Sequence, residues 1–161
     1  ARNTFGAEKY EHLFTRYFFG YLGVEMLSDK FKDLRLRTAA GPGAGYQVWD
    51  VPSSNLSFEL GLSYFNEDYF VGMDDSWYTL RFAGTFAWRI DKAIAFTDYF
   101  VMYNRLNKKD NYKTRNEASI TSALRSNLAL KVSNIIEYDR TPPPKIYRWD
   151  IYWVLSLQYT F

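Results

Sequence analysis

The stretch Asp150-Ile-Tyr-Trp-Val-Leu-Ser-Leu-Gln-Tyr-Thr-Phe161 decides the fold class. Every second residue from Ile151 onwards is apolar or aromatic, whereas the residues between them are mainly polar. Successive side chains of a β-strand point to opposite faces, so this strict alternation predicts a strand with one apolar face and one polar face.

The same period of two recurs through the rest of the chain. For example, Leu128, Leu130 and Val132 alternate with polar residues, and the pattern is weakest in residues 16–28 and 93–104. Such strands are longer than the average of about 5–6 residues and reach the ~9–11 residues that a tilted membrane-spanning strand needs. The pattern predicts eight strands, over residues 16–28, 34–49, 56–69, 77–90, 93–106, 112–124, 127–139 and 149–161.

Composition narrows the class of protein. Lys and Arg total 20 and Asp and Glu total 18, so the charge is nearly balanced and nothing predicts a nucleic-acid partner. Aromatic residues make up 20% of the chain, which is typical of proteins with rings at two membrane interfaces. There are no cysteines, which excludes disulfides and thiolate metal sites. No apolar run approaches the ~20 residues of a spanning helix.

The connections and the rings agree with a membrane barrel. Short connections at 51–54, 91–92 and 125–126 alternate with longer ones at 70–76, 107–111 and 140–148, as in outer-membrane barrels with short periplasmic turns. The exception is 29–33, which is short but falls on the side of the long loops. The sequence therefore predicts an all-β, antiparallel transmembrane β-barrel in the bacterial outer membrane. Two aromatic girdles are expected on its lipid-facing side, an outer one of Tyr64, Tyr78, Tyr103, Tyr138 and Trp149 and an inner one of Tyr46, Trp88, Tyr159 and Phe161.

Residues 3–9 do not fit a barrel of eight strands. By parity, a strand there would begin on the outer side of the membrane. It would also bring the number of strands to nine, whereas bacterial single-chain barrels have even strand numbers. We therefore expect a single domain over residues 1–161 with eight visible strands and two alternatives. Either residues 1–9 are not a full strand and the barrel has eight strands, or the chain is N-terminally incomplete and the intact barrel has ten to twelve. A signal peptide is expected to be absent or already removed.

Several stretches resemble one known family. They are Asp29-Lys-Phe-Lys-Asp-Leu-Arg-Leu-Arg37, Gly41-Pro-Gly-Ala-Gly-Tyr46, Leu60-Gly-Leu-Ser-Tyr64 and the ending Leu157-Gln-Tyr-Thr-Phe161. Across about residues 8–161 the chain resembles the family of salt-induced outer membrane proteins, whose function is unknown. The resemblance implies an outer-membrane barrel, supplies no catalytic residues and implies further strands before Glu8.

Charged residues on the polar parity are the candidates for the lumen, the interior of the expected barrel. Their signs are mixed, so in a small barrel they can pair across the interior. In a wider barrel they would line an aqueous path, where Arg35, Arg37 and Arg81 would attract anions. The candidates are Glu25, Arg35, Arg37, Glu59, Glu67, Arg81, Arg89, Asp98, Glu117, Lys131 and Glu137.

The glycines of the stretch Gly41-Pro-Gly-Ala-Gly45 share one parity and are expected to face the lumen. No Lys-Ser or Lys-Thr pair and no helix follow them, so a phosphate-binding loop is not expected. Without side chains, Gly41, Gly43 and Gly45 let the strand bend or let a large lumenal group approach.

The sequence gives little direct information on function. His12 is the only histidine and has no serine or aspartate partner that spacing would identify, and no metal or cofactor site is expected. We expect a non-enzymatic outer-membrane protein with a structural, stress-related or accessory role, the alternative being a channel for small solutes or ions. A lipid-modifying enzyme and a soluble lipocalin-like barrel are further alternatives.

The expected partners follow from the expected location. They are outer-membrane lipid, a protein partner within an outer-membrane complex and the barrel assembly machinery, which would add the last strand to its own sheet. The residues expected to form that assembly signal are Leu155, Leu157, Tyr159 and Phe161.

Overall fold

The structure is a computed structural model that describes residues 3–29, 34–71, 73–108, 110–125, 127–142 and 147–159. In these ranges it contains β-strands and no helix. The strands have 11 to 18 residues. They are β1 (Asn3–Leu13), β2 (Phe18–Asp29), β3 (Leu34–Val51), β4 (Ser54–Tyr69), β5 (Asp75–Arg89), β6 (Ile94–Arg105), β7 (Tyr112–Arg125), β8 (Leu128–Asp139) and β9 (Trp149–Tyr159).

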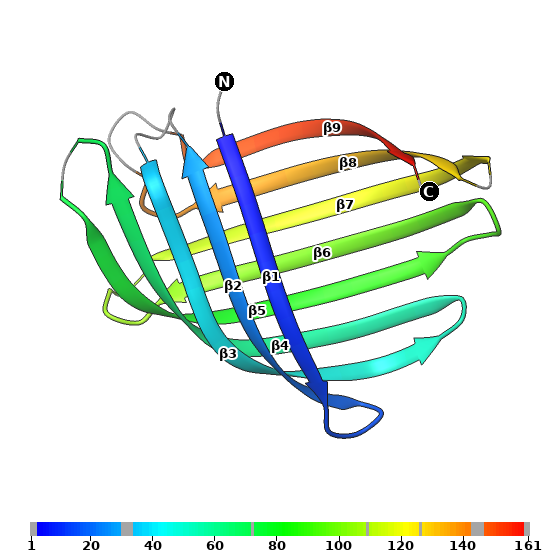
Figure 1. Cartoon of the computed structure of the whole chain (residues 1–161), viewed down its shortest axis with the longest axis horizontal. Helices are drawn as coiled ribbons and strands as arrows, with labels where there is room; N and C mark the ends of the chain where they lie inside the picture. The colour runs from blue at the N-terminus through cyan, green and yellow to red at the C-terminus, as the bar shows by residue number, and fades with distance from the viewer. Residues whose placement is uncertain are drawn as a thin grey trace.

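The strands form one nine-stranded sheet in which every strand pairs antiparallel with its neighbours in sequence (Figure 1). The described residues show no pairing between β1 and β9, so the sheet is open and is not closed into a barrel. Because nine strands alternate in direction, β1 and β9 run the same way.

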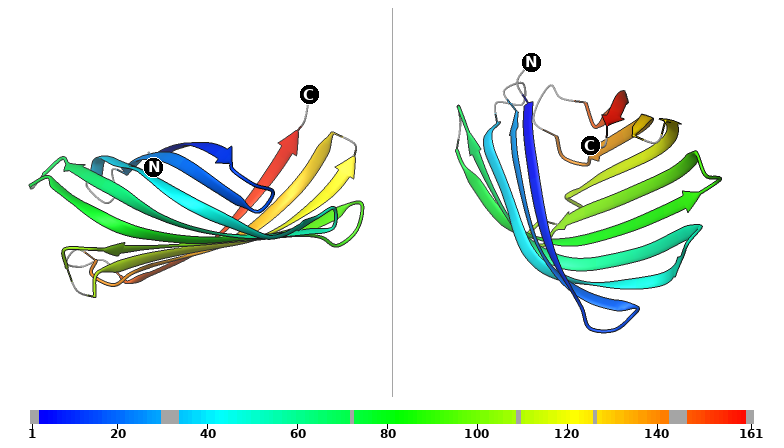
Figure 2. Two further views of the ribbon diagram at one scale, coloured as in Figure 1. Left: turned by 90° about the horizontal axis from the view of Figure 1, so that it is seen from below. Right: turned by 45° about the vertical axis from the view of Figure 1, so that its right-hand side comes forward.

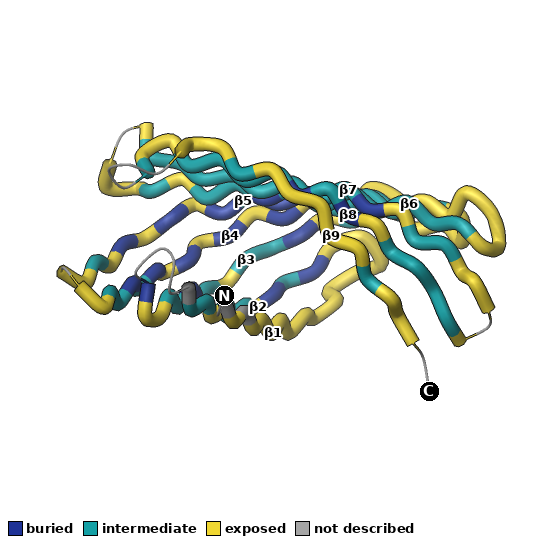
Figure 3. Tube along the Cα trace, turned by 90° about the horizontal axis from the view of Figure 1, so that it is seen from above, coloured by how far each residue is buried: buried dark blue, intermediate teal, exposed yellow. Residues whose placement is uncertain are grey.

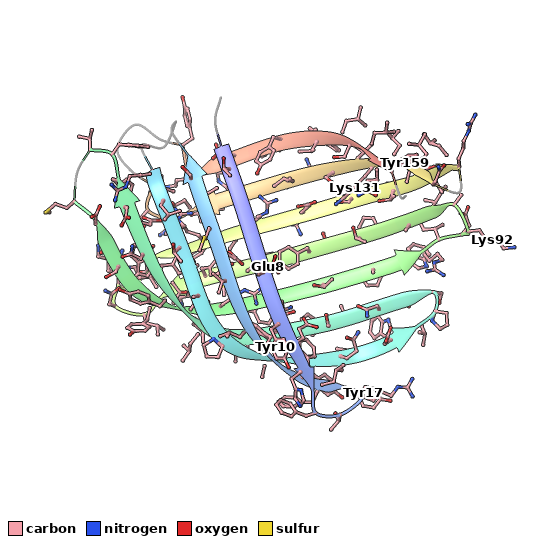
Figure 4. The ribbon with its side chains drawn as sticks, viewed as in Figure 1. Glu8, Tyr10, Tyr17, Lys92, Lys131 and Tyr159 are labelled. Carbon is pink, nitrogen blue, oxygen red and sulfur yellow. The ribbon has the colours of Figure 1, made fainter. Side chains whose placement is uncertain are left out.

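The prediction of eight strands is wrong by one, because residues 3–9 belong to β1. This strand pairs with β2 along its whole length, and Lys9 lies opposite Gly23 in the register. Its outward positions include Glu8 and His12 (Glu8 is labelled in Figure 4), so β1 lacks the apolar alternation on which the sequence prediction depends.

The sheet is strongly twisted and curved (Figure 2). Side chains from strands that are not neighbours meet on one face, for example Arg81 of β5 with Tyr21 of β2, so this face is the concave one. Buried and exposed positions alternate along β4 and β5, as Figure 3 shows. On β4 the buried set includes Glu59 and Glu67, and the exposed set includes Leu60.

The convex face is apolar and exposed. Leu60 on β4 is 54% exposed, and on β9 the exposed fractions of Trp153 and Leu155 are 72% and 71%. The apolar parity that the sequence identifies therefore points away from the concave side. Leu157 and Tyr159 continue this parity to the end of β9, whereas Phe161 lies outside the described residues.

The two ends of the sheet differ as the sequence predicts. Residues 70–74, 106–111 and 140–148 connect strands at one end, here called the loop end. The shorter connections 52–53 and 126–127 lie at the opposite end, the turn end, together with 14–17 and 90–93. The described residues contain no helix that is long and apolar enough to cross a membrane.

Three residues lie on a different face from the one predicted. Tyr103 on β6 was expected in the outer girdle, but it points to the concave side, where its hydroxyl donates to Glu25 at 3.0 Å. Since Tyr103 points inward, Asp98 on the same strand points outward, opposite Phe86 in the register. The third is Leu34, which is buried because a register shift lies between Leu34 and Leu36.

Candidate functional site

The concave face carries three clusters of charged side chains. The central cluster consists of Lys9, Tyr21, Glu59, Arg81 and Tyr99. The Glu59 carboxylate lies between two cations, with Lys9 Nζ 2.5 Å from Oε1 and Arg81 Nη1 2.8 Å from Oε2. Arg81 also donates to the hydroxyls of Tyr21 at 2.9 Å and Tyr99 at 3.0 Å. These residues come from five strands, so the cluster ties the curved sheet together across its interior.

Burial makes the central cluster sensitive to the loss of a charge. The side chains of Glu59 and Arg81 are only 8% and 9% exposed. A buried ion that loses its partner destabilises a protein by about 3–5 kcal/mol, whereas a paired and hydrogen-bonded ion is tolerated. Glu59 and Arg81 are therefore held as a charged pair rather than as isolated groups.

The loop-end cluster consists of Arg37, Glu67, Tyr69, Lys113 and Asp139. Glu67 accepts from Arg37 Nε and from the Tyr69 hydroxyl, both at 2.5 Å. Lys113 Nζ lies 4.0 Å from Glu67 and 3.2 Å from Asp139, so it joins β7 to both β4 and β8. The cluster thus places two cations around one buried carboxylate near the loop end.

The third cluster lies on the last three strands and consists of Arg115, Glu117, Lys131, Glu137 and Tyr152. Arg115 donates to Glu117 at 2.9 Å and to Glu137 at 2.8 Å. Lys131 (labelled in Figure 4) donates to Glu117 at 3.1 Å, and the Tyr152 hydroxyl donates to Glu137 at 3.2 Å. Two acids and two bases therefore balance on this part of the concave face.

Aromatic rings fill the concave side between the clusters and the loop end. Phe65 and Trp77 are stacked with ring centroids 5.7 Å apart, and Tyr103 meets Phe65 edge to face at 5.2 Å. The guanidinium of Arg105 lies 4.1 Å from the centroid of Trp77 and also forms a double hydrogen bond with Asp75. These rings form an apolar layer inside an otherwise polar face.

The glycines make room for two of the rings. A Cβ atom at Gly43 would overlap the ring of Tyr21, and one at Gly45 would overlap the ring of Phe19, each directly across the register on β2. Gly61 on β4 makes room for the Tyr21 hydroxyl in the same way. The predicted role of these inward glycines, the approach of a large group, thus has a structural counterpart.

Most of the predicted lumen residues lie on the concave face. The structure brings together Glu59 with Arg81, Arg37 with Glu67, and Lys131 with Glu117. The other residues of this set that contact a cluster or the aromatic layer are Glu25 and Glu137.

Three predicted lumen residues do not join the clusters. Beside the register shift in β3, Arg35 is 60% exposed and binds Asp68 at 3.2 Å, away from Arg37. Asp98 lies on the convex face and accepts a hydrogen bond from Asn116 at 2.9 Å. Arg89 is exposed at the turn end of β5.

The sequence analysis missed several members of the clusters. Lys9 lies in residues 3–9, which are outside the eight predicted strands, and Arg115 is not among the predicted lumen residues. The tyrosines carry no charge and give no signal in a search for charged residues, so Tyr21, Tyr99 and Tyr152 could be found only from their parity.

The buried polar side chains of the described residues are paired within the chain. The described residues contain no group of three or more His, Cys, Asp or Glu residues that could hold a metal ion. All buried side-chain nitrogen and oxygen atoms among them have hydrogen-bond partners. His12 lies near the turn end with its ring 5.0 Å from that of Phe14. The arrangement stabilises the curved sheet through charge pairing.

These features define a class of protein: an up-and-down antiparallel sheet with an apolar convex face and an ion-paired concave face. The chain belongs to the family described as protein of unknown function, DUF481, whose family model matches residues 1–161. Searches of curated proteins and of solved structures found no significant match.

Proposed function

We propose that this protein is a bacterial outer-membrane β-barrel without enzymatic activity, with a structural or stress-related role or as an accessory to a larger outer-membrane assembly. The observation that supports it is the orientation of the two faces. Ion pairs such as Glu59–Arg81 lie on the concave face, and large apolar side chains such as Trp153 and Leu155 lie exposed on the convex one. A membrane barrel has this arrangement of a polar interior and an apolar exterior.

The orientation also separates the membrane barrel from a lipocalin-like barrel, which needs an apolar interior and a polar exterior. A large exposed apolar surface is rare on soluble monomeric proteins. In a bilayer the same surface contacts hydrocarbon at no cost. Exposed rings near both ends of the convex face, Tyr78 and Trp149 at the loop end and Trp88 and Tyr159 at the turn end, fit two interfacial girdles.

Closure of the sheet is part of the proposal. Free edges of β1 and β9 would leave backbone groups unpaired in hydrocarbon, at several kcal/mol for each group. Because β1 and β9 run in the same direction, a seam between them would be parallel. Bacterial barrels have even strand numbers and antiparallel strands, so we expect an odd number of further strands to complete a barrel of ten or twelve.

The paired charges of the concave face support a structural role over a channel. In the alternative, a conducting lumen, Arg37 and Arg81 would be free to attract anions. Each of them instead binds a buried carboxylate, Glu67 and Glu59 respectively. An aromatic layer of Phe65, Trp77 and Tyr103 further narrows the concave side near the loop end.

The proposed partners are lipid, the barrel assembly machinery and another outer-membrane protein. The edge strand β9 has an unpaired side among the described residues and presents Leu155, Leu157 and Tyr159 on its convex face. An exposed edge of this kind suits recognition by strand addition. The stress-related role follows only from the resemblance to salt-induced outer membrane proteins.

The proposal is tested by membrane extraction and heat modifiability. We expect the protein to be released from cell envelopes only by detergent and to migrate differently on a gel before and after boiling, as folded barrels do. A protein that stays soluble and monodisperse without detergent would contradict the proposal.

A planar-bilayer measurement then separates the two roles. The structural role predicts no current above background. A stepwise current above background would instead establish the channel.

A further inference from the structure

One row of residues on the convex face departs from its apolar character. The register places Phe86 of β5 opposite Asp98 of β6, and Asp98 opposite Ala118 of β7. Ala118 in turn lies opposite Asn134 of β8, and Asn134 opposite Trp153 of β9. Across the sheet, the convex row therefore reads aromatic, acidic, small, amide and aromatic.

The carboxylate of Asp98 is unusual on a surface that is proposed to face lipid. Phe96 and Phe100 lie two positions away on the same face of β6. The one hydrogen bond of the Asp98 carboxylate in the described structure comes from the Asn116 amide, at 2.9 Å. Ionisable groups within a membrane span are rare, and they normally face a protein interior or a polar partner rather than hydrocarbon.

The amide of Asn134 adds a second, independent observation. It lies in the middle of β8, among the outward residues Val132 and Ile136. Within the described ranges, its side chain has no hydrogen-bond partner. Unsatisfied amides in hydrocarbon are costly, because no water is present to bind them.

We propose that the convex face of β6–β8, centred on Ala118, is the contact surface for a second copy of this chain in the membrane. The inference rests on the proposed membrane location. The same patch holds a hydrogen-bond acceptor, Asp98, and an amide donor, Asn134, whereas the Asn116 amide already donates to Asp98 and to the Tyr99 carbonyl. A two-fold interface brings identical patches together, so each copy then offers its Asn134 amide to the Asp98 carboxylate of the other.

The remaining residues of the row suit such a contact. Ala118, between the two polar residues, lets the two sheets approach closely, as small residues do at interfaces between membrane segments. Phe86 and Trp153 at the two ends offer large rings, the type of side chain that anchors interfaces.

Disulfide cross-linking tests the contact directly, because the chain has no cysteine of its own. In membranes treated with a mild oxidant, Ala118→Cys is expected to give a cross-linked dimer. The control is Ala44→Cys, which faces outward on β3 opposite the exposed Leu60 and is expected to stay monomeric. Equal cross-linking of the two variants, or capture of a different protein by Ala118→Cys, would overturn the inference.

The polar groups are tested by the mass of the purified protein in detergent, measured by light scattering over a range of concentrations. Replacing Asp98 and Asn134 by leucine together is expected to weaken dimerisation roughly tenfold, from the loss of interfacial hydrogen bonds. Asp98→Asn retains an acceptor and is expected to retain the dimer. Wild-type protein that is monomeric throughout the range would overturn the inference.

Heat modifiability of the same preparations separates this inference from the proposed function. A heat-modifiable, detergent-extracted protein that is monomeric refutes only the contact between copies. A protein that needs no detergent for extraction refutes the membrane location and therefore also the contact between two copies.

Discussion

The ammonium of Lys9 on β1 lies 2.5 Å from the carboxylate of Glu59 on β4, although the two residues are 50 positions apart in the chain. β1 and β4 are not neighbours in the sheet, so this ion pair crosses the concave face. Glu59 also binds Arg81 of β5, which makes its carboxylate the bridge between one edge of the sheet and its centre. The curvature of the first five strands thus brings a single acid into contact with two bases.

Glu59→Gln is expected to destabilise the folded protein by about 3 kcal/mol, because two cations lose their buried counter-charge. The control is Glu11→Gln, which removes the other carboxylate bound to Lys9. That carboxylate is much more exposed, so the expected cost is below about 1 kcal/mol. Urea unfolding in lipid vesicles, followed by tryptophan fluorescence, measures both values. Equal costs would show that the central cluster does not depend on burial.

The fit of Tyr21 into the glycine gap predicts a coupling between two strands. Gly43→Ala should displace the Tyr21 ring and destabilise the protein by about 1–3 kcal/mol. In the background of Tyr21→Ala the same substitution should cost much less, because the ring is gone.

The control for this coupling is Gly23→Ala, on the same concave face, where a Cβ would meet nothing within 4 Å. A double-mutant cycle measured by urea unfolding checks the coupling. Costs that add independently would contradict the proposed fit.

The orientation of the faces predicts unequal costs for the same substitution at two adjacent positions of β9. Leu155→Arg places a charge on the convex face and should destabilise insertion by about 2–4 kcal/mol if the residue lies near the bilayer centre. Ser156→Arg places the charge on the concave face and should cost much less. The fraction folded into vesicles, read from heat-modifiable migration, gives the comparison. A greater loss from Ser156→Arg would reverse the assignment of the lipid-facing side.

The two arginines that the structure separates from one another give a fourth prediction. Arg37→Met removes the partner of buried Glu67 and should destabilise the sheet by about 3 kcal/mol. Arg35→Met removes only an exposed pair with Asp68 and should change the stability by less than about 1 kcal/mol. Thermal or urea unfolding distinguishes the two. Similar losses would mean that Arg35 also faces the interior.

The sequence predicted the all-β class, the antiparallel order and the polarity of most strands, because period two is a local property of each strand. It was most reliable for β4, β8 and β9, where the alternation is strict. The prediction failed where the local sequence pattern does not determine on which face of the sheet a side chain lies. A register shift in β3 turned Leu34 inward and left Arg35 exposed, and a chain of mixed residues in β6 concealed the inward position of Tyr103.

The members of the three clusters were harder to predict from the sequence than the strands. The pairing of Lys9 with Glu59 depends on how far the sheet curls, which is a property of the whole sheet and not of either strand. β1 was left out of the eight predicted strands for a related reason, since it is defined by its pairing with β2 and not by an apolar face. A period-two pattern within single strands therefore does not predict contacts between strands that are not adjacent.

The meander in which each strand pairs only with its neighbours in sequence also has a kinetic consequence. Each hairpin closes a short loop at small entropic cost, so strand pairing can proceed step by step along the chain. The contact of Lys9 with Glu59 requires four strands to be in place and already curled. It is therefore expected to form late in folding, and its loss should speed unfolding more than it slows folding.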